Sequence, residues 1–113
     1  MKLKIGNHSF DVDLEQNETA TALVKLLPMS ITMSELNGNE KYYYLSESLP
    51  TKPQKPKQIK VGDIMLWGND CLVVFYKSFS TPYSYTKIGH IKNTEDLQSA
   101  VGKSSIAIKW LAD

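Results

Sequence analysis

Tyrosine is the residue type with the most potential for ligand contact in this chain. Six of the eleven aromatic residues are tyrosines, and a tyrosine side chain combines rigid contact area with a polar tip that suits peptide or sugar ligands. The segment SFSTPYSY places a proline and several hydroxyls among three aromatic residues, which a simple strand does not require. We expect an aromatic ligand-binding groove near Tyr43, Phe75, Phe79, Tyr83 and Tyr85; the alternative for each of them is packing within the protein.

Glu35 stands out among the charged residues by its position. Met29, Ile31 and Met33 alternate with polar residues and share one strand face, and Glu35 comes next on that face. A carboxylate at the rim of a groove can bind a ligand or act as a base with a raised pKa, so Glu35 is counted with the groove residues. The alternative is a strand-end bulge that turns Glu35 to solvent. Glu40, beside an Asn-Gly turn, is expected only to solvate that turn.

The histidines and the cysteine do not form a recognisable reactive set. Neither His8 nor His90 has a Cys, Asp or Glu at ligand spacing, so we expect no metal site and no cofactor. Cys71 begins an apolar segment and is expected to be a buried, unreactive thiol. The six glycines are scattered and form no phosphate-binding loop. No catalytic residue is therefore assigned.

The first half of the chain predicts two hairpins and one helix. Alternating apolar residues indicate strands over 2–5 and 8–14, joined by a tight turn. Helical spacing of apolar residues after Asn17 indicates a short helix that Asn17 caps and that Pro28 ends. The dipeptide Asn37-Gly38 lies between an alternating segment and KYYYL, and Asn-Gly accepts positive φ at little cost.

The second half predicts a loop, four strands and another helix. Residues 46–60 hold three prolines and four lysines and are expected to form a loop. The segments IMLW and CLVVFY are apolar at both odd and even positions, which is typical of strands that are covered on both faces. A strand over 86–91, a helix over 94–101 capped by Thr94, and a strand over 106–110 follow. With about eight strands, two short helices and no internal linker, we expect one domain over 1–113, mainly β, with an antiparallel closed barrel favoured over a sandwich.

Charge and composition exclude several classes of partner. The chain has 113 residues and a net charge of +1, too little clustered positive charge to recruit nucleic acid or an anionic membrane. Its longest apolar runs are far shorter than a membrane span, and its first residues lack the apolar core of a signal peptide. We expect a cytoplasmic protein, although a mature exported chain that had lost its leader would look the same. The oligomeric state is left open.

Two stretches, ITMSELNGNEKYYYL and GDIMLWGNDCLVVFYKSFSTPYSYTKIGHI, resemble the small bacterial cyclophilin-like family. The order of the elements also follows that of cyclophilins, and the similarity covers most of the chain. The resemblance implies a closed eight-stranded barrel with a helix at each end and a groove on its outer surface. It does not imply an activity, because the family is named for its shape.

Cyclophilins accelerate rotation about the bond before proline by means of a groove arginine that donates to the twisting amide. All thirteen basic residues of this chain are lysines, and a lysine or a tyrosine does not match the planar fork of a guanidinium. We therefore expect a non-catalytic module that binds a peptide or small-molecule ligand. The alternatives are a weak prolyl isomerase that lacks the usual arginine, and a purely structural domain.

Overall fold

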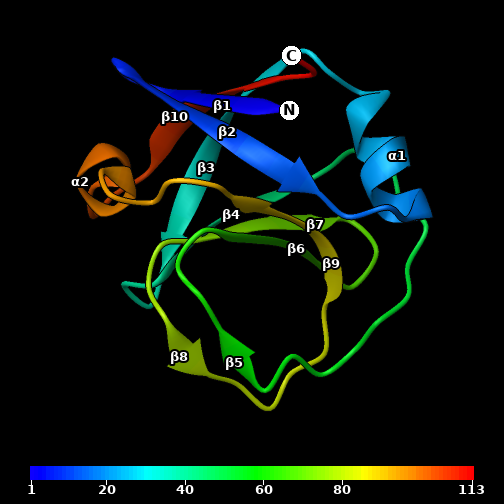
Figure 1. The fold of residues 1–113 in the computed structure, drawn as a ribbon. Coiled ribbons are helices and arrows are strands. Elements are labelled where there is room, and N and C mark those ends of the chain that lie inside the picture. Colours follow the sequence, from blue (N-terminus) through cyan, green and yellow to red (C-terminus); the bar gives the residue numbers. More distant parts are fainter.

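The chain folds into a closed antiparallel barrel, as the sequence predicts. The computed structural model describes residues 1–113. Eight strands close the barrel in the order β1-β10-β3-β4-β7-β6-β9-β2 (Figure 1). Their bounds are β1 Lys2–Ile5, β2 His8–Leu14, β3 Met29–Leu36, β4 Glu40–Tyr44, β6 Asp63–Trp67, β7 Cys71–Phe75, β9 Thr86–Ile91 and β10 Ile106–Leu111.

The two predicted hairpins are present. β1 pairs with β2 and β3 pairs with β4, in each case antiparallel. Asn37 and Gly38 both have positive φ, 56° and 68°, in the turn between β3 and β4. This left-handed backbone is open to asparagine and glycine at little cost, which explains why the dipeptide marks the turn. The register places Leu36 opposite Glu40 and thereby fixes which β4 residues face outward.

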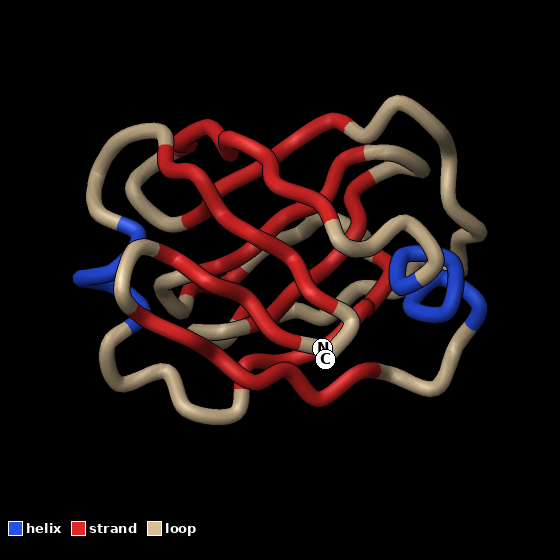
Figure 2. Tube along the Cα trace, turned by 90° about the horizontal axis from the view of Figure 1, so that it is seen from above, coloured by secondary structure: helices blue, strands red, loops and turns tan.

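The helices lie at opposite ends of the barrel (Figure 2). Asn17 caps α1, Glu18–Val24, by accepting a hydrogen bond from the Ala20 N–H at 2.8 Å. The second helix, α2, is Leu97–Val101 and therefore shorter than predicted. Thr94 does not cap it with its side chain, because Asp96 is the flanking residue and makes no side-chain cap bond. Neither helix is long and apolar enough to cross a membrane.

Apolar residues pack on both sides of the central strands. A cluster of twenty buried residues fills the barrel, with Trp110 fully buried in it. A second cluster lies on the outer face of β6 and β7 and consists of Ile59, Met65, Cys71, Val73, Phe75 and Tyr85. All five residues of β7 are buried, because alternate residues of this strand face the barrel interior and the outer cluster. This arrangement confirms the expectation from the two-sided apolar pattern.

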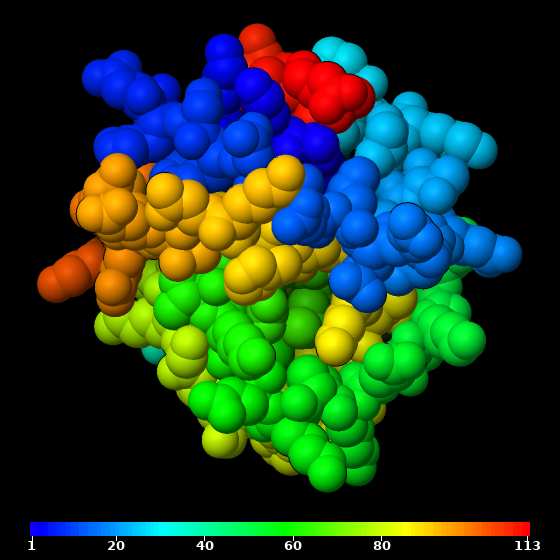
Figure 3. All heavy atoms as spheres, in the orientation of Figure 1, coloured from blue at the N-terminus to red at the C-terminus, as the bar shows by residue number.

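A small second sheet covers this outer cluster. The strands β5, Gln58–Ile59, and β8, Phe79–Ser80, pair with each other beside the barrel (Figure 1). The prediction that 46–60 is entirely loop is therefore wrong at β5, where Ile59 is fully buried. In the space-filling view the green atoms of this part of the chain form a layer that the gold and orange atoms of β9 and α2 separate from the blue N-terminal hairpin (Figure 3). The covering layer ends partway across the outer face of the barrel, next to the site described below.

Candidate functional site

A groove of about 350 Å³ lies on the outer face of the barrel beside the β5–β8 layer. Its floor comes from the outward-facing residues of β4 and β7, which alternate along each strand with residues that face the barrel interior. Eight of its ten lining residues are hydrophobic. The ten are Leu36, Asn37, Glu40, Tyr42, Tyr44, Trp67, Cys71, Val73, Tyr83 and Tyr85.

The large apolar side chains that the fold leaves exposed all line this groove. They are Leu36, Tyr44, Trp67 and Tyr83, with exposed fractions of 43%, 55%, 46% and 60%. Single exposed apolar residues are ordinary on protein surfaces, whereas a contiguous patch marks a site of contact with a ligand or partner. The four come from the end of β3, the end of β4, the end of β6 and the loop before β9. Folding therefore gathers them from three separate regions of the sequence, the β3–β4 hairpin, β6 and the loop before β9.

Buried aromatic rings hold one wall of the groove in place. The ring of Tyr85 packs edge-on against that of Phe75, with centroids 5.5 Å apart. The ring of Phe79 also contacts Phe75, at a centroid distance of 5.6 Å. The backbone of Tyr85 also exchanges two 2.9 Å hydrogen bonds with Gln54. This wall is thus fixed by packing and by main-chain pairing, which reduces the entropy that ligand binding would lose.

Glu40 is the only acidic residue in the groove lining, and it has no partner. Its exposed fraction is 9%, and no hydrogen bond or ion pair engages its carboxylate. Burial, followed by the negative charge of Glu35, raises the pKa of Glu40 to about 7. The expectation that Glu40 only solvates the neighbouring turn is therefore wrong. The register sets it opposite Phe75, whose ring is buried.

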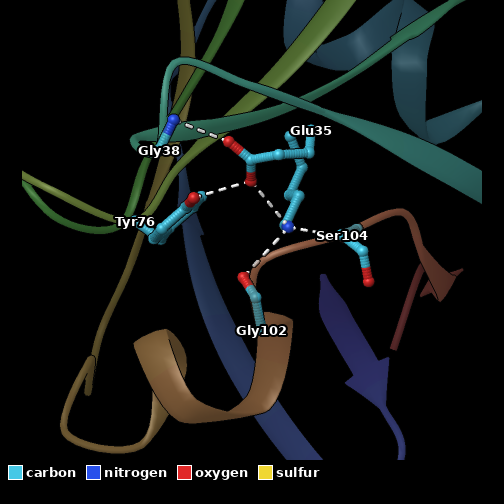
Figure 4. Close-up of polar contacts among 6 residues, drawn as sticks. Glu35, Gly38, Tyr76, Gly102 and Ser104 are labelled. Carbon is cyan, nitrogen blue, oxygen red and sulfur yellow. Dashed lines mark hydrogen bonds and ion pairs between the residues drawn. The ribbon is translucent and has the colours of Figure 1, made fainter.

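On the face of the sheet opposite to the groove, Glu35 pairs with Lys41. Figure 4 shows the network around Glu35, with Gly38, Tyr76, Gly102 and Ser104. Lys41 is fully buried, and its Nζ lies 2.8 Å from Oε1 of Glu35. The ammonium also donates to the carbonyls of Gly102, at 3.0 Å, and Ser104, at 2.6 Å. The Tyr76 hydroxyl donates to the same Glu35 oxygen at 2.6 Å. This network closes the barrel end near α2.

The network sets the protonation state of its members. Burial alone would raise the pKa of Glu35, but hydrogen bonds from Lys41, Tyr76 and the Gly38 N–H, together with the charge of Lys41, lower it. Burial and the bond to Glu35 raise the pKa of Tyr76 to about 12. Glu35 is therefore a structural anion and not a base with a raised pKa. The alternative that a bulge turns it to solvent is also wrong, because its side chain is only 21% exposed.

The structure brings some of the predicted groove residues together and separates others. Tyr83 and Tyr85 line the groove, while Phe75 and Phe79 lie behind its wall. Tyr43 and Glu35 are not among the lining residues, since Tyr43 packs against the core inside the barrel. Sequence reasoning missed the main aromatic contributors of the strands, which are Tyr42, Tyr44 and Trp67.

The structure shows contacts of the histidines and the cysteine that their positions in the sequence do not indicate. Nδ1 of His90 lies 2.9 Å from Oδ1 of Asp63, although the two residues are far apart in sequence. Asp63 also accepts a hydrogen bond from the Lys60 N–H at 2.9 Å, which holds the turn before β6. Cys71 is buried on the groove floor, and burial raises the pKa of its thiol to about 11. No three His, Cys, Asp or Glu side chains cluster as metal ligands would.

Comparison with known proteins identifies a sequence family. The sequence model described as the Cyclophilin-like family matches residues 3–110, which is nearly the whole chain. A search of curated proteins gives no match.

Proposed function

The chain belongs to the cyclophilin-like family, and we propose that it is a binding module that holds a peptide or small ligand in the outer groove without transforming it. The observation that carries this proposal is the convergence of every exposed large apolar side chain on one groove. An exposed apolar patch of this kind favours aggregation unless a ligand or partner covers it. Tyrosine and tryptophan give a guest large contact areas and lose little side-chain entropy in doing so.

The groove follows β4 and suits an extended guest. Glu40 and Tyr44 lie at opposite ends of this strand, and Tyr42 lies between them on the same face. At a rise of about 3.3 Å per residue, the four steps from Glu40 to Tyr44 span roughly 13 Å. A stretch of about four extended peptide residues, or a small elongated molecule, matches that length.

The polar groups around the groove favour binding over isomerisation. Catalysis of proline isomerisation by charge requires a donor placed at the twisting amide. No lysine is among the groove residues, and Lys41, the neighbour of Glu40, is bound inside the barrel by Glu35 and two carbonyls. The remaining polar groups are the tyrosine hydroxyls, the indole N–H of Trp67, the thiol of Cys71, the amide of Asn37 and the carboxyl of Glu40. None of these groups is a permanently charged, planar donor such as the guanidinium group of arginine.

Titration with proline peptides and a fragment library, followed by NMR of the aromatic side chains, tests the proposal. We expect shifts confined to the groove tyrosines and Trp67, and no acceleration of cis-trans exchange in the peptides. The variant W67A should weaken any guest that the wild type binds, while a substitution on the distant surface, K109A, should not. Rapid exchange at micromolar protein would establish a weak prolyl isomerase instead. The absence of any shift would support a purely structural domain.

A further inference from the structure

We infer that the guest of the groove carries an ammonium group, which pairs with the carboxylate of Glu40, and an apolar body, which lies along the aromatic residues toward Tyr44 and Trp67. This inference rests on the proposed function and adds the chemical class of the ligand. It starts from one unusual side chain, a buried acid that faces the groove and has no partner.

Glu40 is largely buried, with 9% of the residue exposed, and yet no group of the protein pairs with its carboxylate. A carboxylate removed from water is normally paired with a cation or held by several hydrogen bonds. The carboxylate of Glu40 has neither, although Glu35, in the adjacent strand, has an ion pair and two further hydrogen bonds. The unmet bonding capacity of Glu40 points into the groove, which it lines.

The groups that surround Glu40 cannot neutralise it. The charged group whose field reaches it is Glu35, which is itself negative. The other titratable groups that interact with Glu40 are Cys71, Tyr76 and Tyr85, which are neutral at pH 7 because burial raises their pKa values. Lys41 is committed to Glu35 on the opposite face of the sheet. A cation that neutralises Glu40 must therefore come from outside the protein.

Aromatic rings beside Glu40 add to the attraction for a cation. Tyr42 follows Glu40 on the same face of β4, and Tyr85 forms the facing wall. The negative face of an aromatic ring attracts an ammonium group, more strongly where water is excluded. Beyond Tyr42 and its neighbour Val73, the lining consists of Tyr44, Cys71 and Trp67. The polarity of the groove thus runs from an acidic end to an aromatic end.

This chemistry gives a characteristic pH dependence. An alkylammonium ion keeps its proton throughout pH 6–8, whereas Glu40 with a pKa of about 7 is mostly protonated at pH 6 and mostly ionised at pH 8. Only the ionised form pairs with a cation, so the affinity for an amine should rise about tenfold over this range. A guest that instead accepts a hydrogen bond from protonated Glu40 would bind more tightly at pH 6.

Calorimetric titration with 4-phenylbutylamine and its neutral counterpart 4-phenylbutan-1-ol tests the inference. The two molecules share shape and apolar area and differ in charge. We expect the amine to bind about tenfold more tightly at pH 8 than at pH 6, and to exceed the alcohol by at least tenfold at pH 8. The alcohol should show no rise with pH.

The variant E40Q assigns the effect to one residue. Glutamine keeps the shape of the side chain and removes its charge, so E40Q should melt cooperatively and bind the amine and the alcohol alike at both pH values. The control E47Q removes an exposed carboxylate outside the groove and should behave as the wild type. A preference for the amine that survives in E40Q would overturn the role of Glu40.

The remaining outcomes separate this inference from the proposed function. Equal binding of amine and alcohol in the groove would overturn the ammonium inference and leave the binding module in place. Tighter binding at pH 6 would also overturn it, in favour of a ligand that accepts a hydrogen bond. Binding of neither molecule would overturn it as well, and the peptide and fragment titrations would then decide the proposed function by themselves.

Discussion

Glu40 and Lys41 are consecutive residues of β4, yet they lie on opposite faces of the sheet and do not pair. Lys41 points into the barrel and binds Glu35, whereas Glu40 lines the outer groove. The strand alternates its side chains between two faces, so adjacent opposite charges are held apart by geometry. As a result, one carboxylate is fully compensated and the other is not.

The Lys41 network should contribute strongly to stability. Replacing Lys41 by methionine removes the charge partner of Glu35 and leaves the carbonyls of Gly102 and Ser104 without their donor. We expect K41M to lower the free energy of unfolding by about 2–4 kcal/mol, as measured by urea denaturation. The matched control K109M, at an exposed lysine of β10, should change it by less than about 0.5 kcal/mol. An equally small effect of K41M would mean that packing alone holds this barrel end.

The buried acid Glu40 should make the protein less stable at higher pH. Its pKa is 4.5 when unperturbed and about 7 in the fold, so the folded state binds this proton more tightly than the unfolded chain does. The free energy of unfolding should therefore fall as pH rises from about 4.5 to about 7, and this contribution should then level off. Between pH 5 and pH 8 the loss should be on the order of 2–3 kcal/mol.

Urea denaturation of the wild type and of E40Q at these two pH values checks the prediction. E40Q should lack the decrease in the free energy of unfolding that Glu40 causes between these pH values, and E47Q should retain it. Glu35 does not interfere, because its pKa is lowered and its contribution is lost only as pH falls below about 4.5. Parallel pH profiles for the wild type and E40Q would show that Glu40 is not the group responsible.

Residues on the groove surface and residues behind its wall should respond differently to truncation. Phe75 is fully buried, and F75A should destabilise the protein by about 3–5 kcal/mol, because it leaves a cavity. Tyr83 is 60% exposed, and Y83A should alter stability by no more than about 0.5 kcal/mol while weakening guest binding several-fold. Thermal unfolding combined with ligand titration measures both effects. A Y83A variant that binds every guest as the wild type does would remove Tyr83 from the site.

The thiol on the groove floor should be unreactive. Burial raises the pKa of Cys71 to about 11, so at pH 8 little of it is the nucleophilic thiolate. We expect its reaction with a disulfide reagent to be roughly a hundredfold slower than that of a free cysteine, and to become normal in urea. Fast labelling of the folded protein would show that the groove opens to its floor.

The sequence alone determined the elements and the class of the fold. Period-two patterns, the Asn37-Gly38 turn and the two-sided apolar segment of β7 report local geometry, and local geometry is encoded by neighbouring residues. The Asn17 cap was predictable for the same reason, because its acceptor and the Ala20 N–H are three residues apart. The boundaries of α2 and the short strand β5 were not, since distant contacts decide whether such weak elements form.

Only the tertiary structure decided where the groove lies. Tyr42, Tyr43 and Tyr44 place aromatic rings on both faces of β4, so the local pattern does not say which face is turned outward. Closure of the barrel turns Tyr43 inward, and the β5–β8 layer covers one part of the outer surface and leaves another open. The partners of Glu35 and the isolation of Glu40 follow from the same closure. Which charges meet depends on strand register and on packing between distant segments, and neither is a property of neighbouring residues in the chain.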